Sequence, residues 1–313
     1  MNPRSRVDQP AQGSASPEHA SRRTFLRGVG LAGAASLAGP LVANTSASAS
    51  VSGVILGCNA GIYSKFTTAV PGATGCRSYR DDVIHKASDV PRTFPGEHGS
   101  KVVASIRPHP DALLSGDLDD ALKKMLREAA ANFSAPQLTV WHEAGNLYKS
   151  RSYITPTAVR QMHVKMHKLC REVGGVGYGC IIYGDISAMA KWIPYKPYAL
   201  DWYGIDVYWN SAFDFSTYDK LKSYLDEYRA LAKRRTGLKY PKINVCETNT
   251  HVESNRPQFF TNVARWLDGN GGRRMLTFYK AGGQSGGAWD PKDTKTIDAL
   301  RYIQAHYGPS QSG

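Results

Sequence analysis

The chain alternates between short apolar runs and longer segments whose apolar residues recur every three or four positions. Eight runs are rich in β-branched and aromatic residues and carry few charges, which is typical of strands that are covered on both faces in a parallel sheet. They span residues 51–59, 76–81, 101–109, 137–143, 177–185, 200–209, 242–249 and 274–282.

Amphipathic helices are predicted between these strands. Apolar residues follow the helical period over residues 118–133, 218–232, 257–267 and 297–307, and a further helix is expected to start at Thr155 and Pro156. Residues 82–100 are too polar and too rich in proline and glycine for a full helix, so a loop or one short turn is expected there. Eight strand and helix units in about 264 residues predict an α/β fold of the (β/α)8 TIM-barrel type, whose typical length is about 250 residues.

The N-terminus has the pattern of an export signal. Residues 21–28, SRRTFLRG, carry a twin-arginine pair, and a small-residue apolar run and an ASA sequence at residues 47–49 follow. We therefore expect residues 1–49 to be a twin-arginine signal peptide, residues 50–313 to be the catalytic barrel, and the mature protein to be secreted. Nowhere else does an apolar run approach the roughly 18 residues that a membrane span needs.

The charge is strongly positive. Residues 50–313 hold 34 Lys and Arg against 24 Asp and Glu, a net of +10. This surplus favours contact with an anionic cell-wall polymer, although solubility alone would also explain it. Nucleic acid is disfavoured as a partner because the basic residues are dispersed along an exported chain.

Five cysteines lie in the exported part. Short loops favour disulfides between Cys58 and Cys76 and between Cys170 and Cys180, and Cys246 is expected to be a free, buried residue of an apolar strand.

Metal binding is not expected, and neither is a cofactor. There is no CxxC spacing, and His163 and His167 share one helix face without a third ligand nearby.

Two glutamates carry the candidate chemistry. Glu143 and Glu247 each end an apolar run, and the 104 positions between them equal about three barrel units, which places them on strands four and seven. Active sites of such barrels lie at the carboxyl ends of the strands. Two carboxyl groups facing each other there would serve as proton donor and nucleophile or base for glycosidic bond cleavage. The alternative is that each glutamate forms a salt bridge at a strand end.

Aromatic residues gather near the same strand ends. Each of them alone is more often a packing residue between barrel and helices, but together they favour a cleft that binds the apolar faces of sugar rings. They are Trp141, Tyr148, Trp192, Tyr195, Tyr198, Trp202, Tyr208, Trp209, Tyr279 and Trp289.

The sequences WHE at 141–143, GIDVYW at 204–209 and ETNT at 247–250 resemble the clan A glycoside hydrolases, retaining (β/α)8 barrels, and most closely family 26, which includes β-mannanases. The resemblance implies that Glu143 is the general acid/base and Glu247 the nucleophile. It further implies that His142 orients Glu143 or a substrate hydroxyl, and that Tyr208 donates a hydrogen bond to Glu247. The resulting set of substrate-binding residues is His142, Asn146, Asp206, Tyr208, Trp209, Tyr279 and Trp289.

Two departures from the family concern the sugar more than the chemistry. The order after Glu143 is Ala, Gly, Asn instead of a bulkier residue followed by Asn and Gly. The strand-eight tryptophan is missing, which leaves Tyr279 or Trp289 to replace it.

We therefore expect a monomeric, secreted retaining hydrolase that cuts a β-linked polysaccharide of the mannan, xylan or glucan class. A barrel that binds wall polysaccharide without cutting it is the alternative, since it would need the aromatics and the positive charge but not the two glutamates.

The export hypothesis predicts a clear phenotype. Replacing Arg22 and Arg23 by lysine should leave uncleaved precursor in the cytoplasm, because the arginine pair is the feature that defines this type of signal. Immunoblots of cytoplasmic and secreted fractions measure this, and unchanged secretion would contradict the hypothesis.

Overall fold

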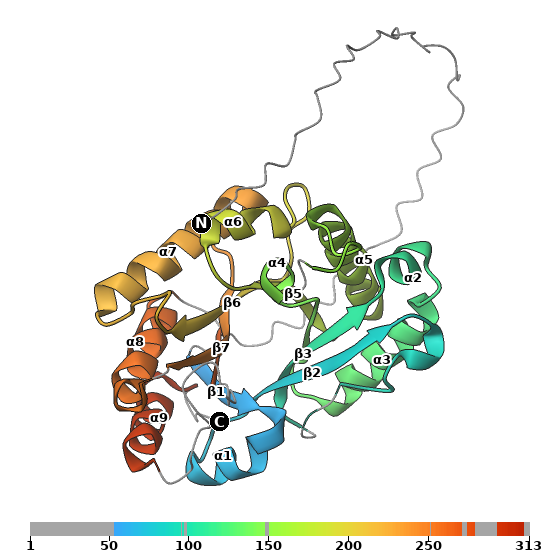
Figure 1. Ribbon diagram of the computed structural model, residues 1–313. Helices are drawn as coiled ribbons and strands as arrows, with labels where there is room; N and C mark the ends of the chain where they lie inside the picture. The colour runs from blue at the N-terminus through green and yellow to red at the C-terminus, as the bar shows by residue number, and fades with distance from the viewer. Residues whose placement is uncertain are drawn as a thin grey trace, which may run out of the picture. The chain divides into compact units, whose positions relative to one another are not determined.

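Eight parallel strands form a closed barrel in the order β1 to β8 (Figure 1). The structure, a computed structural model, describes residues 53–94, 96, 99–147, 150–250, 252–270, 274–278 and 293–309. The predicted (β/α)8 fold is confirmed. The strands are β1 Val54–Asn59, β2 Gly75–Ile84, β3 Lys101–Pro108, β4 Gln137–Val140, β5 Gly177–Ile182, β6 Trp202–Trp209, β7 Ile243–Thr250 and β8 Arg274–Phe278.

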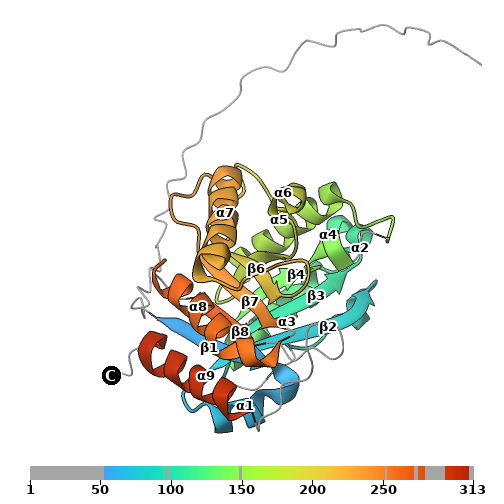
Figure 2. The ribbon, with the colours of Figure 1, turned by 60° about the vertical axis from the view of Figure 1, so that its left-hand side comes forward.

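Helices surround the barrel on its outside (Figure 2). The α-helices are α1 Tyr63–Ala69, α2 Pro110–Ser115, α3 Asp119–Asn132, α4 Ala144–Leu147, α5 Pro156–Val173, α6 Ile186–Met189, α7 Tyr218–Thr236, α8 Arg256–Asp268 and α9 Thr294–Tyr307. Short 3-10 turns lie at Ala60–Ile62, Ala87–Asp89, Ala190–Trp192 and Glu253–Asn255. As predicted, the described part of the β2–β3 connection holds one short turn and no α-helix.

Helix α5 begins where the sequence predicts. The Thr155 hydroxyl accepts a hydrogen bond from the Ala158 backbone N–H at 3.1 Å, and Pro156 occupies the first turn, where its missing N–H costs nothing. These local preferences fix the start of a helix whose inner face packs on β4 and β5.

The barrel interior and the outer layer form separate apolar clusters. Inside, the cluster consists of Ile55, Val103, Ile181, Trp202 and Cys246, and the larger cluster fills the space between strands and helices. Trp202 needs glycine next to it, since a Cβ added at Gly179 would lie 2.2 Å from its ring. The Trp202 indole therefore fits inside the barrel because Gly179, on the neighbouring strand β5, has no side chain.

Both expected disulfides are wrong. All five cysteines are free and buried. Cys58 and Cys76 are register partners on β1 and β2 and belong to the same apolar cluster, so they act as small core residues. Burial raises the pKa of the Cys170 and Cys180 thiols, which keeps them protonated and unreactive. Cys246 is buried as expected.

Two further expectations concern the signal-peptide boundary and the absence of a membrane-spanning segment. The proposed boundary between residues 49 and 50 lies outside the described residues and stays a prediction. Among the described helices, none combines the length and the apolar character that a bilayer crossing requires.

The contact between Gly179 and Trp202 yields a stability prediction. Gly179→Ala should lower the free energy of unfolding by about 1 to 3 kcal/mol, the usual effect of overpacking a core. Gly61→Ala is the matched control, because a Cβ at Gly61 would meet nothing within 4 Å. Urea denaturation of both variants measures the difference, and equal stabilities would contradict the packing described here.

Candidate active site

Three carboxyl groups meet inside the barrel. Glu143 follows β4, Asp206 lies on β6 and Glu247 lies on β7, and one oxygen of each lies within 4.8 Å of the others. Glu143 is 7% exposed, Asp206 0% and Glu247 5%. Three buried carboxyl groups this close cannot all be ionised, so at least one of them must carry a proton.

The backbone after β4 is bent so that Glu143 turns back toward the barrel. Trp141 has φ 45° and Glu143 φ 52°, both in the left-handed region. The Trp141 backbone N–H donates to Ile106 on β3, the Glu143 N–H donates to Ile181 on β5, and the Trp141 indole donates to the Pro108 carbonyl at 2.7 Å. Such backbone strain costs about 1 to 3 kcal/mol per residue and gathers at functional sites.

A bulge in β7 aims Glu247 inward. Ile205 pairs with Val245 and Asp206 pairs with Glu247, so Cys246 is an extra residue on β7. Because side chains alternate along a regular strand, only such an insertion lets the neighbours Cys246 and Glu247 both face the interior.

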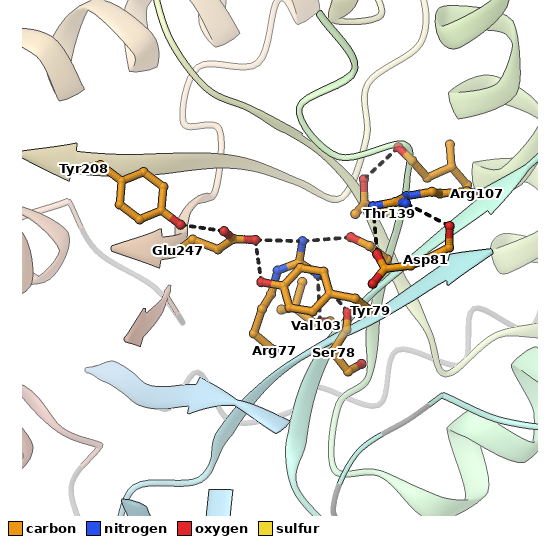
Figure 3. A network of polar contacts seen from close by, with 11 residues as sticks. Arg77, Ser78, Tyr79, Asp81, Val103, Arg107, Thr139, Tyr208 and Glu247 are labelled. Atoms are coloured by element: carbon orange, nitrogen blue, oxygen red, sulfur yellow. Dashed lines mark hydrogen bonds and ion pairs between the residues drawn. The ribbon is translucent and has the colours of Figure 1, made fainter. Parts of the chain in front are cut away.

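Glu247 is surrounded by donors (Figure 3). The Tyr208 hydroxyl donates to Oε2 at 2.6 Å, and the Tyr79 hydroxyl donates to Oε1. The Arg77 guanidinium lies 3.6 Å from Oε1 and is itself fully buried. Together these groups stabilise a negative charge on Glu247. The hydrogen bond from Tyr208 that the family resemblance implies is therefore present.

Arg77 is held in place by the barrel wall. It donates to the Ser105 hydroxyl at 2.8 Å and to the Val103 carbonyl at 3.1 Å, both on β3. A guanidinium cannot lose its proton, so one permanent positive charge lies beside Glu247.

Glu143 and Asp206 have the opposite tendency. Burial, and then the negative charge of Glu247, raises the pKa of Glu143 to about 8. Burial, followed by the charges of Glu247 and Glu143, raises the pKa of Asp206 well above its usual range. At neutral pH the site therefore holds a protonated Glu143 opposite Glu247, whose negative charge Arg77 and the two tyrosines stabilise.

His142 is neutral and packs beside this group. Its ring centre lies 5.3 Å from that of Tyr79, and burial, together with the charges of Arg77 and Arg107, holds its pKa well below the usual range. A neutral imidazole here can accept or donate one hydrogen bond to a substrate hydroxyl.

The carboxyl cluster also has the spacing of metal ligands. Arg77 already supplies the positive charge that a cation would bring to Glu247. The other metal candidate, His163, is buried and its Nδ1 lies 2.8 Å from the Tyr178 hydroxyl, so it belongs to the packing of α5 on β5.

Of the remaining predicted site residues, only Trp209 has a described side chain. Its ring centre lies 6.0 Å from that of Phe259 on α8, on the face of β6 opposite to that of Tyr208, and its role in substrate binding stays a prediction. Asn146 lies in α4, and only its backbone is described. Tyr279 and Trp289 lie outside the described residues. Of the other aromatics, Trp141 and Trp192 are buried in packing.

Two functional residues were missed, Arg77 and Tyr79. Both lie on β2, two positions apart, so they share the inward face of the strand. The indication in the sequence was an arginine at the second position of an otherwise apolar start, CRSY, with a tyrosine two residues on.

Fold and site together define a (β/α)8 barrel with a buried carboxylic acid and a buried carboxylate opposed at the ends of strands four and seven. No protein-family model matches the chain, and no curated protein does. A β-mannanase of glycoside hydrolase family 26 from Bacteroides ovatus aligns with a TM-score of 0.51 and 11% identity over 82% of this chain and 89% of its own. A fungal β-1,4-galactanase aligns with a TM-score of 0.51 and 13% identity, over 79% and 93%. At such identities the likeness is one of fold.

The raised pKa of Glu143 predicts a pH dependence of stability. Between the ordinary value of 4.5 and the folded value of about 8, the native chain holds a proton that the unfolded chain has lost. This contribution to stability is complete below pH 4.5 and is lost as the pH rises through about 8, with a slope of about 1.4 kcal/mol per pH unit. Glu143→Gln should therefore reduce the pH dependence of the free energy of unfolding by this slope. Urea unfolding between about pH 5 and about pH 8 measures both proteins, and parallel curves would contradict the assigned protonation.

Proposed function

We propose that this protein is a retaining glycoside hydrolase that acts on a β-linked polysaccharide. The observation that carries the proposal is the opposition of Glu143, protonated at neutral pH, and Glu247, which accepts two tyrosine hydrogen bonds and pairs with Arg77, with carboxyl oxygens within 4.8 Å. Retaining enzymes separate their two carboxyl groups by about 5 to 5.5 Å and inverting enzymes by about 6.5 to 9.5 Å. An oxygen separation of at most 4.8 Å is nearer to the retaining range than to the inverting range, which supports a retaining mechanism.

Glu143 acts as general acid and then as general base. It donates its proton to the glycosidic oxygen while a Glu247 oxygen attacks the anomeric carbon, which breaks the C–O bond and forms a glycosyl ester on Glu247. Glu143, now a carboxylate, takes a proton from water as that water attacks the ester, and Glu247 leaves as a carboxylate. Each carboxyl group ends in its starting state.

The surrounding residues prepare this pair. Arg77, Tyr79 and Tyr208 fix Glu247 and stabilise its charge before substrate arrives. Asp206, protonated and adjacent to both glutamates, adds no second negative charge to the cleft. The strained turn at Glu143 fixes the direction of the proton donor.

The substrate class rests on the relatives by fold and on the sequence. The two aligned proteins are described as a β-mannanase and a β-1,4-galactanase. We infer that the substrate of this chain is a β-linked polysaccharide of the mannan, xylan or glucan class and that it is cut internally. Export through the twin-arginine signal and action as a monomer belong to the same proposal.

Substitution of the two glutamates tests the proposal. Loss of a catalytic proton transfer typically lowers the rate about 10² to 10⁴-fold. Glu247→Ala should abolish turnover, whereas Glu143→Ala should keep activity on aryl glycosides whose leaving group needs no protonation. Azide should restore the Glu143 variant with a product of retained configuration and the Glu247 variant with an inverted one, as measured by proton NMR.

The control is Glu128→Ala, which removes an exposed carboxylate on α3 and should leave turnover unchanged. If both glutamate variants stay folded and as active as the wild type, the hydrolase proposal fails. A wild type that binds polysaccharide but cuts none of the polymers tried would support the non-catalytic barrel instead.

A further inference from the structure

A groove lies on the outer flank of the barrel, away from the carboxyl cluster. It has a volume of about 500 Å³ and runs between the outer face of α5 and residues 194–198, the segment that leads into β6. Nothing in the proposed hydrolysis uses these residues.

One wall of the groove is a continuous stripe of α5. It consists of Thr157, Arg160, Gln161, Val164, Lys165 and Lys168, spaced at three and four positions, so that they share one helix face. The eleven helical steps from Thr157 to Lys168 correspond to about 16 Å. This length suits a segment of a polymer better than a single ion.

Every charged residue of the lining is positive. Arg160, Lys165, Lys168 and Lys196 line the groove, and no acidic residue does. Lys165 is neutralised by Asp119 at 2.6 Å. Among the described residues, no ion pair is formed by Arg160, Lys168 or Lys196 within 4.0 Å. An anionic ligand in the groove would therefore be the first negative charge within ion-pair distance of these three cations.

Two arginines converge on one tyrosine at the edge of the groove. The guanidinium carbons of Arg160 and Arg235 each lie 5.2 Å from the ring centre of Tyr195. Their hydrogen-bond partners are neutral: Arg235 donates to the Ala190 carbonyl at 2.8 Å, and Arg160 donates to the Lys191 carbonyl at 2.5 Å and to the Thr157 hydroxyl at 3.2 Å. Burial and the charge of Arg160 lower the pKa of Arg235, so the two like charges oppose each other. An anion bound here would relieve that repulsion.

An exposed aromatic face completes the groove. Tyr198 is 45% exposed, and Pro194, Pro197 and Val164 give the lining an apolar part. A flat ring beside apolar contacts is how proteins hold the C–H face of a sugar, whereas a purely phosphate polymer would need only the cations.

We propose that this groove is a second binding site, which takes a segment of an acidic polysaccharide whose sugars carry carboxylates. Tyr198 stacks on a sugar ring, and Arg160, Lys168 and Lys196 bind the carboxylates. The site holds the protein on an anionic polymer independently of the cleavage reaction at Glu143 and Glu247.

Binding measurements on the full mature chain test the proposal, with polygalacturonate as the acidic polysaccharide, neutral galactomannan as the uncharged one and poly-glutamate as a polyanion without sugar. Affinity electrophoresis should show retardation by polygalacturonate. The variant Lys168→Gln with Lys196→Gln should weaken this binding about tenfold, as expected for the loss of two charge-assisted contacts. Tyr198→Ala should weaken binding of polygalacturonate about fivefold and leave any binding of poly-glutamate unchanged.

The matched control is Lys239→Gln with Tyr240→Ala. Tyr240 is 79% exposed and Lys239 lies over its ring at 5.1 Å, so the control removes an exposed lysine and tyrosine outside the groove. It should bind polygalacturonate as the wild type does. Equal weakening by the control and the groove variants, or equal binding of poly-glutamate with no effect of Tyr198→Ala, would overturn the proposal in favour of general charge attraction. All groove variants should keep the wild-type activity on neutral substrate, which separates this test from that of the hydrolase.

Discussion

The contact between Arg77 and Glu247 is the interaction on which the site depends. A guanidinium buried at 0% exposure costs several kcal/mol unless a negative charge and hydrogen bonds compensate it. One ionised carboxylate restores neutrality, and a second or third would leave the interior negative. The charge of Arg77 therefore favours one negative charge among the three carboxyl groups. The hydrogen bonds from the two tyrosine hydroxyls stabilise that charge on Glu247. Protonation of Glu143 follows from this balance.

Geometry supplies what charge balance does not. Trp141 and Glu143 keep left-handed backbones because hydrogen bonds to β3 and β5 hold the turn from both sides. On the opposite wall, the extra residue Cys246 shifts Glu247 into the interior. Two irregularities, one on each strand, bring the carboxyl groups together, and a barrel of regular strands would have aimed at least one of them differently.

The barrel and the positions of both glutamates could be predicted from the sequence, because the hydrophobic period and the ends of apolar runs are visible among residues close together in the chain. Arg77 and Tyr79 escaped notice because their partner, Glu247, lies 168 positions from Tyr79 and no local pattern records a contact made across the barrel. The sequence did not show that Trp209 and Tyr208 lie on opposite faces of β6, because one step along a strand reverses the face. The disulfide predictions were wrong because spacing in sequence does not show how thiols are placed in the fold. Cys58 and Cys76 lie on neighbouring strands in an apolar layer, and Cys170 lies on α5 whereas Cys180 lies on β5.

Salt should act differently on the two regions of the molecule. Exposed charges such as Lys168 and Lys196 interact through water, where the Debye length is about 8 Å at physiological ionic strength, so attraction of an anionic polymer weakens as salt rises. The charges of Arg77 and Glu247 are buried and 3.6 Å apart, with no electrolyte between them. If the proposed groove binds a charged polymer, rising ionic strength would therefore weaken that binding without disturbing the proton on Glu143. Separate positions for attachment and chemistry let the protein change the first and keep the second constant.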